Sequence, residues 1–271
     1  MRPRLVALLE PYLGSVAALV VPGYAFMLGL GALLGAMLTL DRARRAGFSR
    51  EATLAVLART YVAGLAGACA VPVGQGALAW LGGGGFAPPT GMAAYGGLVG
   101  GTVGAILALR ARKMAVATFL DAGAPAVGLG YFFARIGCFL AGCDYGAPTA
   151  SALGATFPAG SYAFRDHVAR GLVDARAAES LPVHPTQLYS SLAGLALYVV
   201  VSRLPVTRPG FRFASMVLGY ATVRAAIEAL RGDATRGHLG PLSTSQVFAI
   251  ATAALAAAFV LKSAVGVRSG R

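Results

Sequence analysis

The amino-acid sequence predicts an all-α fold: a polytopic membrane protein with about seven transmembrane helices. Hydrophobic residues make up 57% of the 271 residues and charged residues only 12%, against about 25% charged residues in a typical soluble domain. The charges are also clustered, because residues 11–40, 60–109 and 239–261 contain no Asp, Glu, Lys or Arg. A helix that crosses a bilayer needs roughly 20 apolar residues, and each of these stretches is long enough to supply at least one.

The first predicted helix covers residues 14–40 and is expected to be retained in the mature protein. The basic sequence MRPR precedes it, as in a secretory signal, but Glu10 interrupts the start of the apolar segment. The segment is also longer than the apolar part of a signal peptide, and no clear cleavage site follows it.

Six further helices are expected between polar or glycine-rich segments. The uncharged block 60–109 holds two of them and divides at the GGGGFAPP cluster (82–89), since consecutive glycines and prolines do not continue a helix. The fourth helix of the chain is unusual because it contains Asp121, Pro125 and Arg135. The six predicted helices cover residues 54–80, 93–110, 115–141, 184–202, 212–230 and 244–264.

The longest segment between predicted helices is too short to form a domain of its own. Residues 1–271 are therefore expected to form a single integral-membrane domain. Residues 142–183 are expected to form a small head on it, between the fourth and fifth helices.

The positions of the basic residues predict how the chain is oriented. Thirteen of the 23 Lys and Arg residues lie on one side of a seven-helix arrangement, and cytoplasmic loops attract these residues. The C-terminus is therefore expected in the cytoplasm, and the N-terminus and the head on the outer, periplasmic side, although Arg2 and Arg4 fit this orientation less well. The thirteen residues are Arg42, Arg44, Arg45, Arg50, Arg110, Arg112, Lys113, Arg203, Arg208, Arg212, Lys262, Arg268 and Arg271.

The net charge of +13 bears on the partners of the chain. It fits membrane orientation together with attraction to the anionic headgroups of a lipid bilayer. Nucleic acid is excluded as a partner, because no separate soluble basic domain carries the charge.

Two arginines fall within predicted helices, Arg135 in GLGYFFARIGCFLAGCDYG and Arg224 in LGYATVRAAIEALRGD. A charged side chain in lipid costs at least a few kcal/mol, so it normally faces a protein interior, a partner or a water-filled cavity. Glu228 lies four residues after Arg224 and Arg231 three further on, so the spacing predicts an Arg–Glu–Arg cluster on one helical face. Such a cluster is either a set of internal salt bridges or an anion site. Guanidinium groups bind phosphate oxygens in a bidentate fork, and the anion available at that depth is a phospholipid headgroup.

Several segments together are similar to those of one known family. The sequence ARIGCFLAGCDYG (134–146) resembles the signature G-R-I-G-N-F-x-N-x-E-x-Y/W-G of the prolipoprotein diacylglyceryl transferases, and HPTQLY (184–189) matches that family almost letter for letter. The segments APT, GATFP, GYATVRAAIEALRGD, LSTSQ, GYAFMLGLG and GMAAYGGLVGG are similar to further parts of the family. The matches run in family order across residues 24–246, and their combination is specific for the fold.

The resemblance implies an activity, a location and partners. The family transfers a diacylglyceryl group from phosphatidylglycerol to the thiol of a lipobox cysteine in a prolipoprotein signal peptide, and glycerol phosphate is released. The reaction takes place on the outer side of the bacterial inner membrane. The family has seven membrane spans with the N-terminus outside. No metal and no organic cofactor are expected.

The resemblance also implies roles for particular residues. Arg135 and Arg224 would hold the lipid phosphate and stabilise it as it leaves, while Glu228 and Arg231 would orient Arg224 or close the site. Tyr24 would contact the lipid from the first helix. The remaining substrate-binding positions are Gly146, which packs its backbone beside the headgroup, His184 near the mouth of the cavity with Gln187 and Tyr189 below it, and Cys138, Gly96 and Gly97.

The sequence departs from the family pattern where the family handles protons. Tyr95 replaces the histidine that is the proposed general base, and tyrosine, with an ordinary pKa near 10, is a poor base at neutral pH. Cys138, Ala141 and Cys143 replace the two asparagines and the glutamate of the signature. His184 is therefore a second candidate for the base. A plainer reading of HPTQLY makes it only the start of a helix, with Thr186 as the cap.

The paired cysteines leave three interpretations open. Cys138 and Cys143 are buried, unreactive thiols, or form a disulfide if the helix ends near Gly142, or supply a reactive thiol. A metal site is not expected, since two cysteines without paired histidines make an incomplete ligand set. His167 and His238 are expected to be solvated loop residues.

Two alternative functions compete with diacylglyceryl transfer. One is a phospholipid-dependent transferase of the same fold with a different acceptor, and the other is a non-catalytic protein that binds or transports lipid. The missing histidine favours these alternatives. The retained Arg135, Arg224 and Glu228, together with HPTQLY, favour the transfer to a lipobox cysteine.

Overall fold

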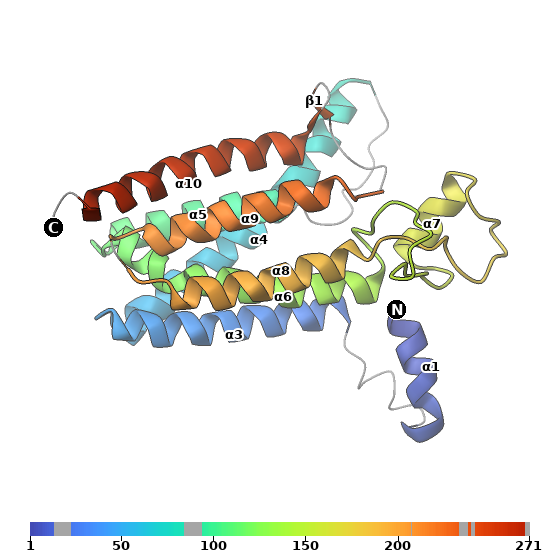
Figure 1. Ribbon diagram of the computed structural model, residues 1–271, viewed down its shortest axis with the longest axis horizontal. Coiled ribbons are helices and arrows are strands. Elements are labelled where there is room, and N and C mark those ends of the chain that lie inside the picture. The colour runs from blue at the N-terminus through green and yellow to red at the C-terminus, as the bar shows by residue number, and fades with distance from the viewer. Residues whose placement is uncertain (14–22, 84–93, 207, 233–237, 240–241, 269–271) are drawn as a thin grey trace. The chain divides into compact units, whose positions relative to one another are not determined.

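The computed structural model describes residues 1–13, 23–83, 94–206, 208–232, 238–239 and 242–268, and it is helical apart from one short hairpin (Figure 1). The helices are α1 (Arg2–Leu13), α3 (Tyr24–Arg45), α4 (Arg50–Leu81), α5 (Ala94–Ala111), α6 (Val116–Ala141), α7 (Tyr162–Ala169), α8 (Thr186–Arg203), α9 (Phe211–Glu228) and α10 (Thr244–Arg268). The hairpin pairs β1 (His238–Leu239) with β2 (Leu242–Ser243), antiparallel. The predicted helical fold class is confirmed.

Each of the seven predicted membrane helices corresponds to a long helix within the described residues. The last six agree with the prediction to within four residues at each end, as α4, α5, α6, α8, α9 and α10. Residues 14–22 of the first predicted helix lie outside the described residues, and α3 continues past the predicted end to Arg45. Its last turn carries Arg42, Arg44 and Arg45, which favour a helix C-terminus because they complement the helix dipole.

Not all of these helices are equally suited to cross a membrane. Three of them, at Tyr24–Arg45, Arg50–Gly74 and Val116–Ala141, are long and apolar enough by length and composition. Gly96–Ala111 and Ala249–Leu261 are apolar but shorter. The coarse prediction of a helical membrane protein is supported, and the crossing of the bilayer by all seven helices stays a prediction.

Helices α1 and α7 were not predicted from the sequence, and both are held by tertiary contacts. Arg4 on α1 donates a hydrogen bond to the Thr156 hydroxyl over 3.0 Å and forms an ion pair with Glu179. Helix α7 begins at the N-cap Ser161, whose hydroxyl accepts a hydrogen bond from the backbone N–H of Phe164 over 3.2 Å. Neither helix has the long apolar run that identifies the others.

The chain divides into two compact units, of which one is Leu38–Ala122. In this unit α4 and α5 pack backbone against backbone. A Cβ added to Gly96 would collide with the carbonyl of Gly67, and one added to Gly64 would lie 3.3 Å from the Gly97 carbonyl oxygen. Small residues allow this close approach, as they commonly do between membrane helices. Apolar side chains fill the end of the unit, namely Ala43, Val56, Ala108, Leu109, Phe119 and Ala122.

The other unit comprises Met1–Met37 and Gly123–Arg271, and α6 contacts two other helices within it. Helix α6 meets α8 where Gly128 faces Gly194, since a Cβ on Gly128 would lie 2.9 Å from the Gly194 carbonyl oxygen. It meets α3 at Gly137, where an added Cβ would lie 3.1 Å from Cδ2 of Tyr24. Helix α9 packs along both α8 and α10.

The segment between α6 and α8 folds into a small compact head that contains α7 (Figure 1). Its apolar centre is formed by Tyr145, Phe157, Ala163 and Val183, all buried, and Phe139 near the end of α6 packs against them. Residues 142–183, which were predicted to form the head, include α7 and the buried residues Tyr145, Phe157 and Ala163. Its position on the outer side of a membrane stays a prediction.

Candidate functional site

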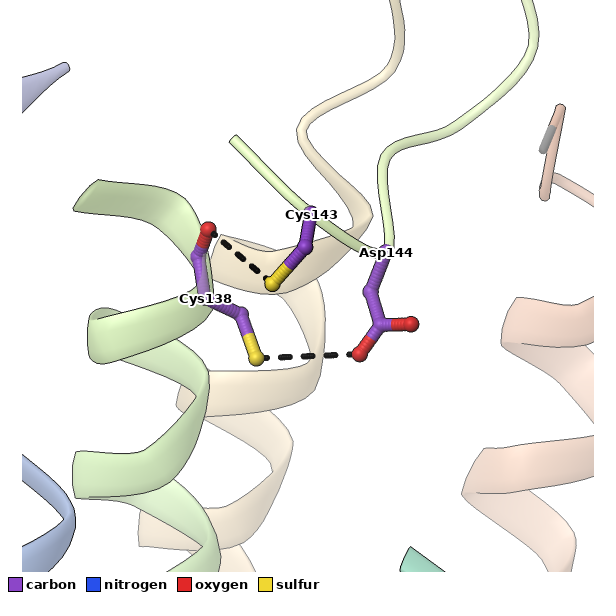
Figure 2. A group of neighbouring side chains, drawn as sticks. All are labelled: Cys138, Cys143 and Asp144. Atoms are coloured by element: carbon purple, nitrogen blue, oxygen red, sulfur yellow. Dashed lines mark hydrogen bonds between the residues drawn. The ribbon is translucent and has the colours of Figure 1, made fainter. Parts of the chain in front are cut away.

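The candidate site is built on the turn that ends α6. Gly142 adopts a left-handed conformation with φ of +78°, and the backbone N–H groups of Gly142 and Cys143 both donate to the Cys138 carbonyl, over 2.8 and 3.2 Å. This is the hydrogen-bonding pattern of a glycine-terminated helix. Asp144 is also left-handed, with φ of +56°. The chain therefore folds back over the helix end, and the side chains of Cys138, Cys143 and Asp144 gather in one place (Figure 2).

One carboxylate in this turn binds two guanidinium groups. Oδ2 of Asp144 lies 2.5 Å from Nη1 of Arg135, and Oδ1 lies 2.8 Å from Nη2 of Arg231. Burial raises the pKa of the Asp144 carboxyl, but the two arginines outweigh burial and hold this pKa well below its usual range. Asp144 is therefore ionised at neutral pH and joins α6 to the segment after α9.

Arg135 is held on a second side by an aromatic ring. Its guanidinium carbon lies 4.9 Å from the centre of the Tyr131 ring, one helical turn earlier on α6. The side chain is 11% exposed. A cation over a tyrosine face is stabilised by the ring quadrupole, so Arg135 has two contacts that fix its direction.

Arg224 has a buried carboxylate partner on its own helix. Its Nη1 lies 2.6 Å from Oε2 of Glu228, and the two side chains are 9% and 2% exposed. This half of the predicted Arg–Glu–Arg cluster is confirmed. The other half was wrong, because α9 ends at Glu228 and Arg231 leaves the helical path to reach Asp144 instead.

The two predicted phosphate-binding arginines lie at one level of neighbouring helices. On α6 and α9 the rings of Tyr131 and Tyr220 meet edge to face with centres 5.1 Å apart. A Cβ on Gly128 of α6 would lie 3.1 Å from Cε of Met216 on α9. Residue numbers therefore increase in the same direction from one contact to the next on both helices, so α6 and α9 run parallel. Arg135 and Arg224 each follow their tyrosine by four residues, about one turn, and therefore lie at a similar height along the two helices.

The HPTQLY segment anchors the turn rather than capping a helix. The Thr186 hydroxyl donates to the Asp144 carbonyl over 2.7 Å, and Nε2 of Gln187 donates to the Cys143 carbonyl over 2.8 Å. The predicted cap at Thr186 was wrong, since the N-cap of α8 is Pro185 and no side chain caps it. The motif therefore fixes the backbone of the residues that carry the site.

His184 contributes its backbone and leaves part of its ring unsatisfied. Its N–H donates to the Ala147 carbonyl over 3.0 Å, and its carbonyl accepts from the N–H of Gly146 over 2.9 Å. Among the described residues, Nδ1 of the ring is buried without a hydrogen-bond partner. The centres of the His184 and Tyr189 rings lie 6.3 Å apart. Its role as a base stays a prediction.

Gly146 has the close backbone contacts that the sequence predicts. A Cβ at this position would lie 2.6 Å from both Cβ and the carbonyl oxygen of His184, and 2.8 Å from the carbonyl oxygen of Leu230. Backbone hydrogen bonds run here from Gly146 to His184 and from Ala147 to Leu230. The glycine lets three segments meet beside Asp144.

The other predicted site residues divide between the two units. Tyr24 lies against Gly137 of α6, within electrostatic range of Arg135 and Asp144. Tyr95 is the second residue of α5 in the unit Leu38–Ala122, and its side chain lies outside the described residues. Gly96 and Gly97 pack α5 against α4 in the same unit, and their contact with substrate stays a prediction.

The histidine expected to be solvated is buried. His167 has no solvent exposure, and its Nδ1 accepts a hydrogen bond from the Leu181 N–H over 3.2 Å. Its ring lies edge to face with Tyr145, centres 5.3 Å apart. The expectation was wrong because the head folds α7 onto residues 145 and 181. The side chain of His238 lies outside the described residues.

The thiols of Cys138 and Cys143 are not joined in a disulfide. The helix does end before Gly142, as a bridge would require. Sγ of Cys138 instead lies 3.6 Å from Oδ2 of Asp144, and Sγ of Cys143 lies 3.8 Å from the Cys138 carbonyl oxygen (Figure 2). Asp144 itself was missed from the sequence. Its signal was an acidic residue one place after the position where the family signature has glutamate.

Comparison with known proteins gives one consistent result. Residues 11–262 match the family model described as prolipoprotein diacylglyceryl transferase. The chain is 30% identical over 248 residues to phosphatidylglycerol–prolipoprotein diacylglyceryl transferase 2 of Clostridium perfringens, covering 88% of this chain and 89% of that protein. It is 29% identical over 255 residues to phosphatidylglycerol–prolipoprotein diacylglyceryl transferase of Clostridium tetani, covering 90% and 94%. The chain belongs to the prolipoprotein diacylglyceryl transferase family.

Proposed function

We propose that this protein transfers a diacylglyceryl group from phosphatidylglycerol to the thiol of a lipobox cysteine in a prolipoprotein and releases glycerol phosphate. The family membership supports this transferase activity. The structural observation that carries it is the pair of buried arginines, Arg135 and Arg224, at one level of parallel helices and each held by a carboxylate. Such a pair can bind one phosphate from two sides.

The charges of the site suit the donor. Arg135, Arg224 and Arg231 carry three positive charges against the two negative charges of Asp144 and Glu228. One positive charge therefore remains, which matches the single negative charge of a phosphodiester. As the glycerol carbon–oxygen bond breaks, a second negative charge develops on the phosphate. Guanidinium groups already oriented by ion pairs stabilise it without first reorganising, which is where electrostatic catalysis acts.

The site residues take distinct roles in this proposal. Arg135 and Arg224 bind the phosphate, while Glu228, Asp144 and Arg231 position them. Tyr24, beside Gly137, contacts the lipid from α3. Gly146, Gln187, Tyr189 and Cys138 hold the turn or the substrate around it. Gly96 and Gly97 are proposed as further substrate-binding positions, and His184 and Tyr95 as candidate bases.

The membrane arrangement is part of the proposal. All seven long helices cross the bacterial inner membrane, with the N-terminus and the 142–183 head outside and the C-terminus in the cytoplasm. The distribution of basic loop residues supports this orientation. Phosphatidylglycerol then reaches the arginines from the outer leaflet, and the prolipoprotein signal peptide reaches them from the bilayer.

A second candidate keeps the donor and changes the acceptor. It is favoured by Tyr95 at the position of the family histidine, since a tyrosine does not readily deprotonate a thiol at neutral pH. In that case the transferred group goes to another thiol or to a hydroxyl.

The test is to incubate the purified chain with phosphatidylglycerol and a lipobox peptide. We expect a thioether-linked peptide and glycerol phosphate in equal amounts, and Arg135→Ala or Arg224→Ala should lower the rate by at least 100-fold, roughly the effect of removing one preorganised charge donor. Arg165→Ala is the matched control, because Arg165 is exposed on α7 in the same unit. Near-normal turnover in either buried-arginine variant would contradict the phosphate role. Glycerol phosphate without modified peptide would indicate the second candidate.

A further inference from the structure

Cys138, Cys143 and Asp144 form a compact set of three possible metal ligands. Each offers one ligand atom, two Sγ atoms and one carboxylate oxygen, and these atoms all lie within 4.8 Å of one another (Figure 2). We propose that they bind a thiophilic divalent cation of the Zn²⁺ type, with a fourth position open to the acceptor thiol. This inference rests on the proposed transferase function, for which it supplies the activation of the thiol.

The distances fit a small tetrahedral ion. With zinc–sulfur bonds of about 2.3 Å and zinc–oxygen bonds of about 2.1 Å, neighbouring ligand atoms lie roughly 3.4–3.8 Å apart. Sγ of Cys138 and Oδ2 of Asp144 are already separated by 3.6 Å. The Cys143 thiol lies within 4.8 Å of both of these atoms, and it follows the left-handed Gly142 in the turn. The two cysteines alone were an incomplete set, and Asp144 supplies the third ligand.

The surroundings hold this set in place. The carbonyls of Cys143 and Asp144 accept hydrogen bonds from Gln187 and Thr186, which fix the backbone of two ligands. Arg135 and Arg231 bind the carboxylate of the third ligand. Hydrogen bonds of this kind orient the ligands of protein metal sites and are part of their affinity.

The two arginines tolerate a bound dication because the net charge that they face does not change. Binding replaces two thiol protons by one divalent ion, so the cluster has a charge of −1 before and after. Each carboxylate oxygen has two lone pairs, so Asp144 can bind a metal while it still accepts hydrogen bonds from Arg135 and Arg231. The guanidinium groups remain partners of the ligand and are not displaced.

The open position faces the accessible side of the cluster. Cys138 is buried, Cys143 is half-buried, and the Asp144 side chain is 33% exposed. Three protein ligands leave one corner of a tetrahedron for a substrate, as in catalytic zinc sites. A thiol that binds there loses its proton to water, because a coordinating thiol is deprotonated outright.

The transfer step then follows without a protein base. The metal-bound sulfur attacks the glycerol carbon and forms a carbon–sulfur bond. The bond between that carbon and the phosphate oxygen breaks, and its electron pair stays on the departing glycerol phosphate. Arg135 lies next to the cluster and binds that phosphate. The metal therefore holds the nucleophile, and the neighbouring arginine stabilises the leaving group. The thioether product is neutral and binds the metal weakly, which allows release.

The first experiment measures metal binding without any turnover. The chelator-treated full chain in detergent is titrated with Co²⁺, and then dialysed against Zn²⁺. We expect tetrahedral Co²⁺ absorption with a thiolate charge-transfer band and about one Zn²⁺ per chain. Cys143→Ser and Cys138→Ser should lower retained Zn²⁺ by at least tenfold, and Cys69→Ser, an exposed cysteine on α4, should leave it unchanged. No thiolate band in the wild-type chain, or equal retention in all variants, would overturn the site.

The second experiment separates this inference from the proposed function. Transfer from phosphatidylglycerol to a lipobox peptide is measured with the chelated chain, before and after addition of Zn²⁺. We expect the rate to fall at least tenfold without metal and to recover with it. Full transfer without metal would overturn the metal-bound thiol and leave the transferase function intact. Metal binding with no transfer under either condition would overturn the proposed function, and the binding site would stand on the Co²⁺ spectrum.

Discussion

The buried ion pair between Arg224 and Glu228 gives the sharpest prediction for stability. Glu228→Gln keeps the size of the side chain and removes its charge. The two side chains are 9% and 2% exposed and their charged atoms lie 2.6 Å apart, so Arg224 would become a buried cation without its carboxylate. Breaking a buried pair from one side costs about 3–5 kcal/mol. We expect the lower end of that range, because the Gln amide oxygen can still accept one hydrogen bond.

The same change can be measured as a shift in thermal unfolding. For a chain of this size 1 kcal/mol corresponds to roughly 2–4 °C in Tm, so Glu228→Gln should lower the Tm in detergent by about 6–12 °C. Glu51→Gln is the matched control, since Glu51 is exposed in the first turn of α4. The double variant Arg224→Met with Glu228→Gln should recover most of the lost stability, while transfer activity stays absent. A Tm for Glu228→Gln within 1 °C of the wild type would refute the reasoning that this pair is buried and coupled.

Three further predictions concern the turn and the head. Asp144→Asn, measured with chelator present, should lower the Tm by several degrees and the transfer rate by about 100-fold, because the Arg135 guanidinium is no longer held in position. Asp174→Asn is the control, since Asp174 is exposed in the head, and it should change neither quantity. Gly146→Ala should cost about 1–3 kcal/mol by overpacking, whereas Gly130→Ala, with no atom within 4 Å, should not destabilise the chain. Burial lowers the pKa of His167, so its contribution to stability is present above its ordinary pKa of 6.5 and is lost as the pH falls. The protection of amides in the head, which is the exchange rate corrected for the pH dependence of the intrinsic rate, should therefore fall between pH 7 and pH 5, and unchanged protection would contradict this.

The helices could be predicted from the sequence because their signal is simple. Long apolar runs with few charges mark the seven helices, and basic or glycine-rich segments mark their ends, within four residues for the last six. Helices α1 and α7 lacked that signal. Helix α7 has eight residues, and its stability comes from buried Phe164 and His167 in contact with the rest of the head. Such contacts join residues far apart in the sequence, so no local sequence pattern predicts them.

The site was predictable where one helix carries both partners. Arg224 and Glu228 are four apart on α9, and that spacing alone gives the ion pair. Arg231 was assigned wrongly because the same spacing rule was extended past the end of α9 at Glu228. Asp144 was missed because its position depends on two left-handed residues after α6. Neither event follows from periodicity, since both occur where a helix stops.

The choice that the sequence left open, between internal salt bridges and an anion site, is not a choice between exclusive alternatives. A guanidinium group has five N–H donors in a planar fork. The ion pair and hydrogen bond between Arg135 and Asp144 are made through Nη1 of the arginine. A carboxylate can therefore fix the direction of an arginine while other donors of the same group bind phosphate oxygens. Removing the carboxylates would make the site more positive, but the arginine side chains would be less ordered. The catalytic rate should fall despite the added positive charge, because the donors stabilise the developing charge only when they already point at the leaving oxygen.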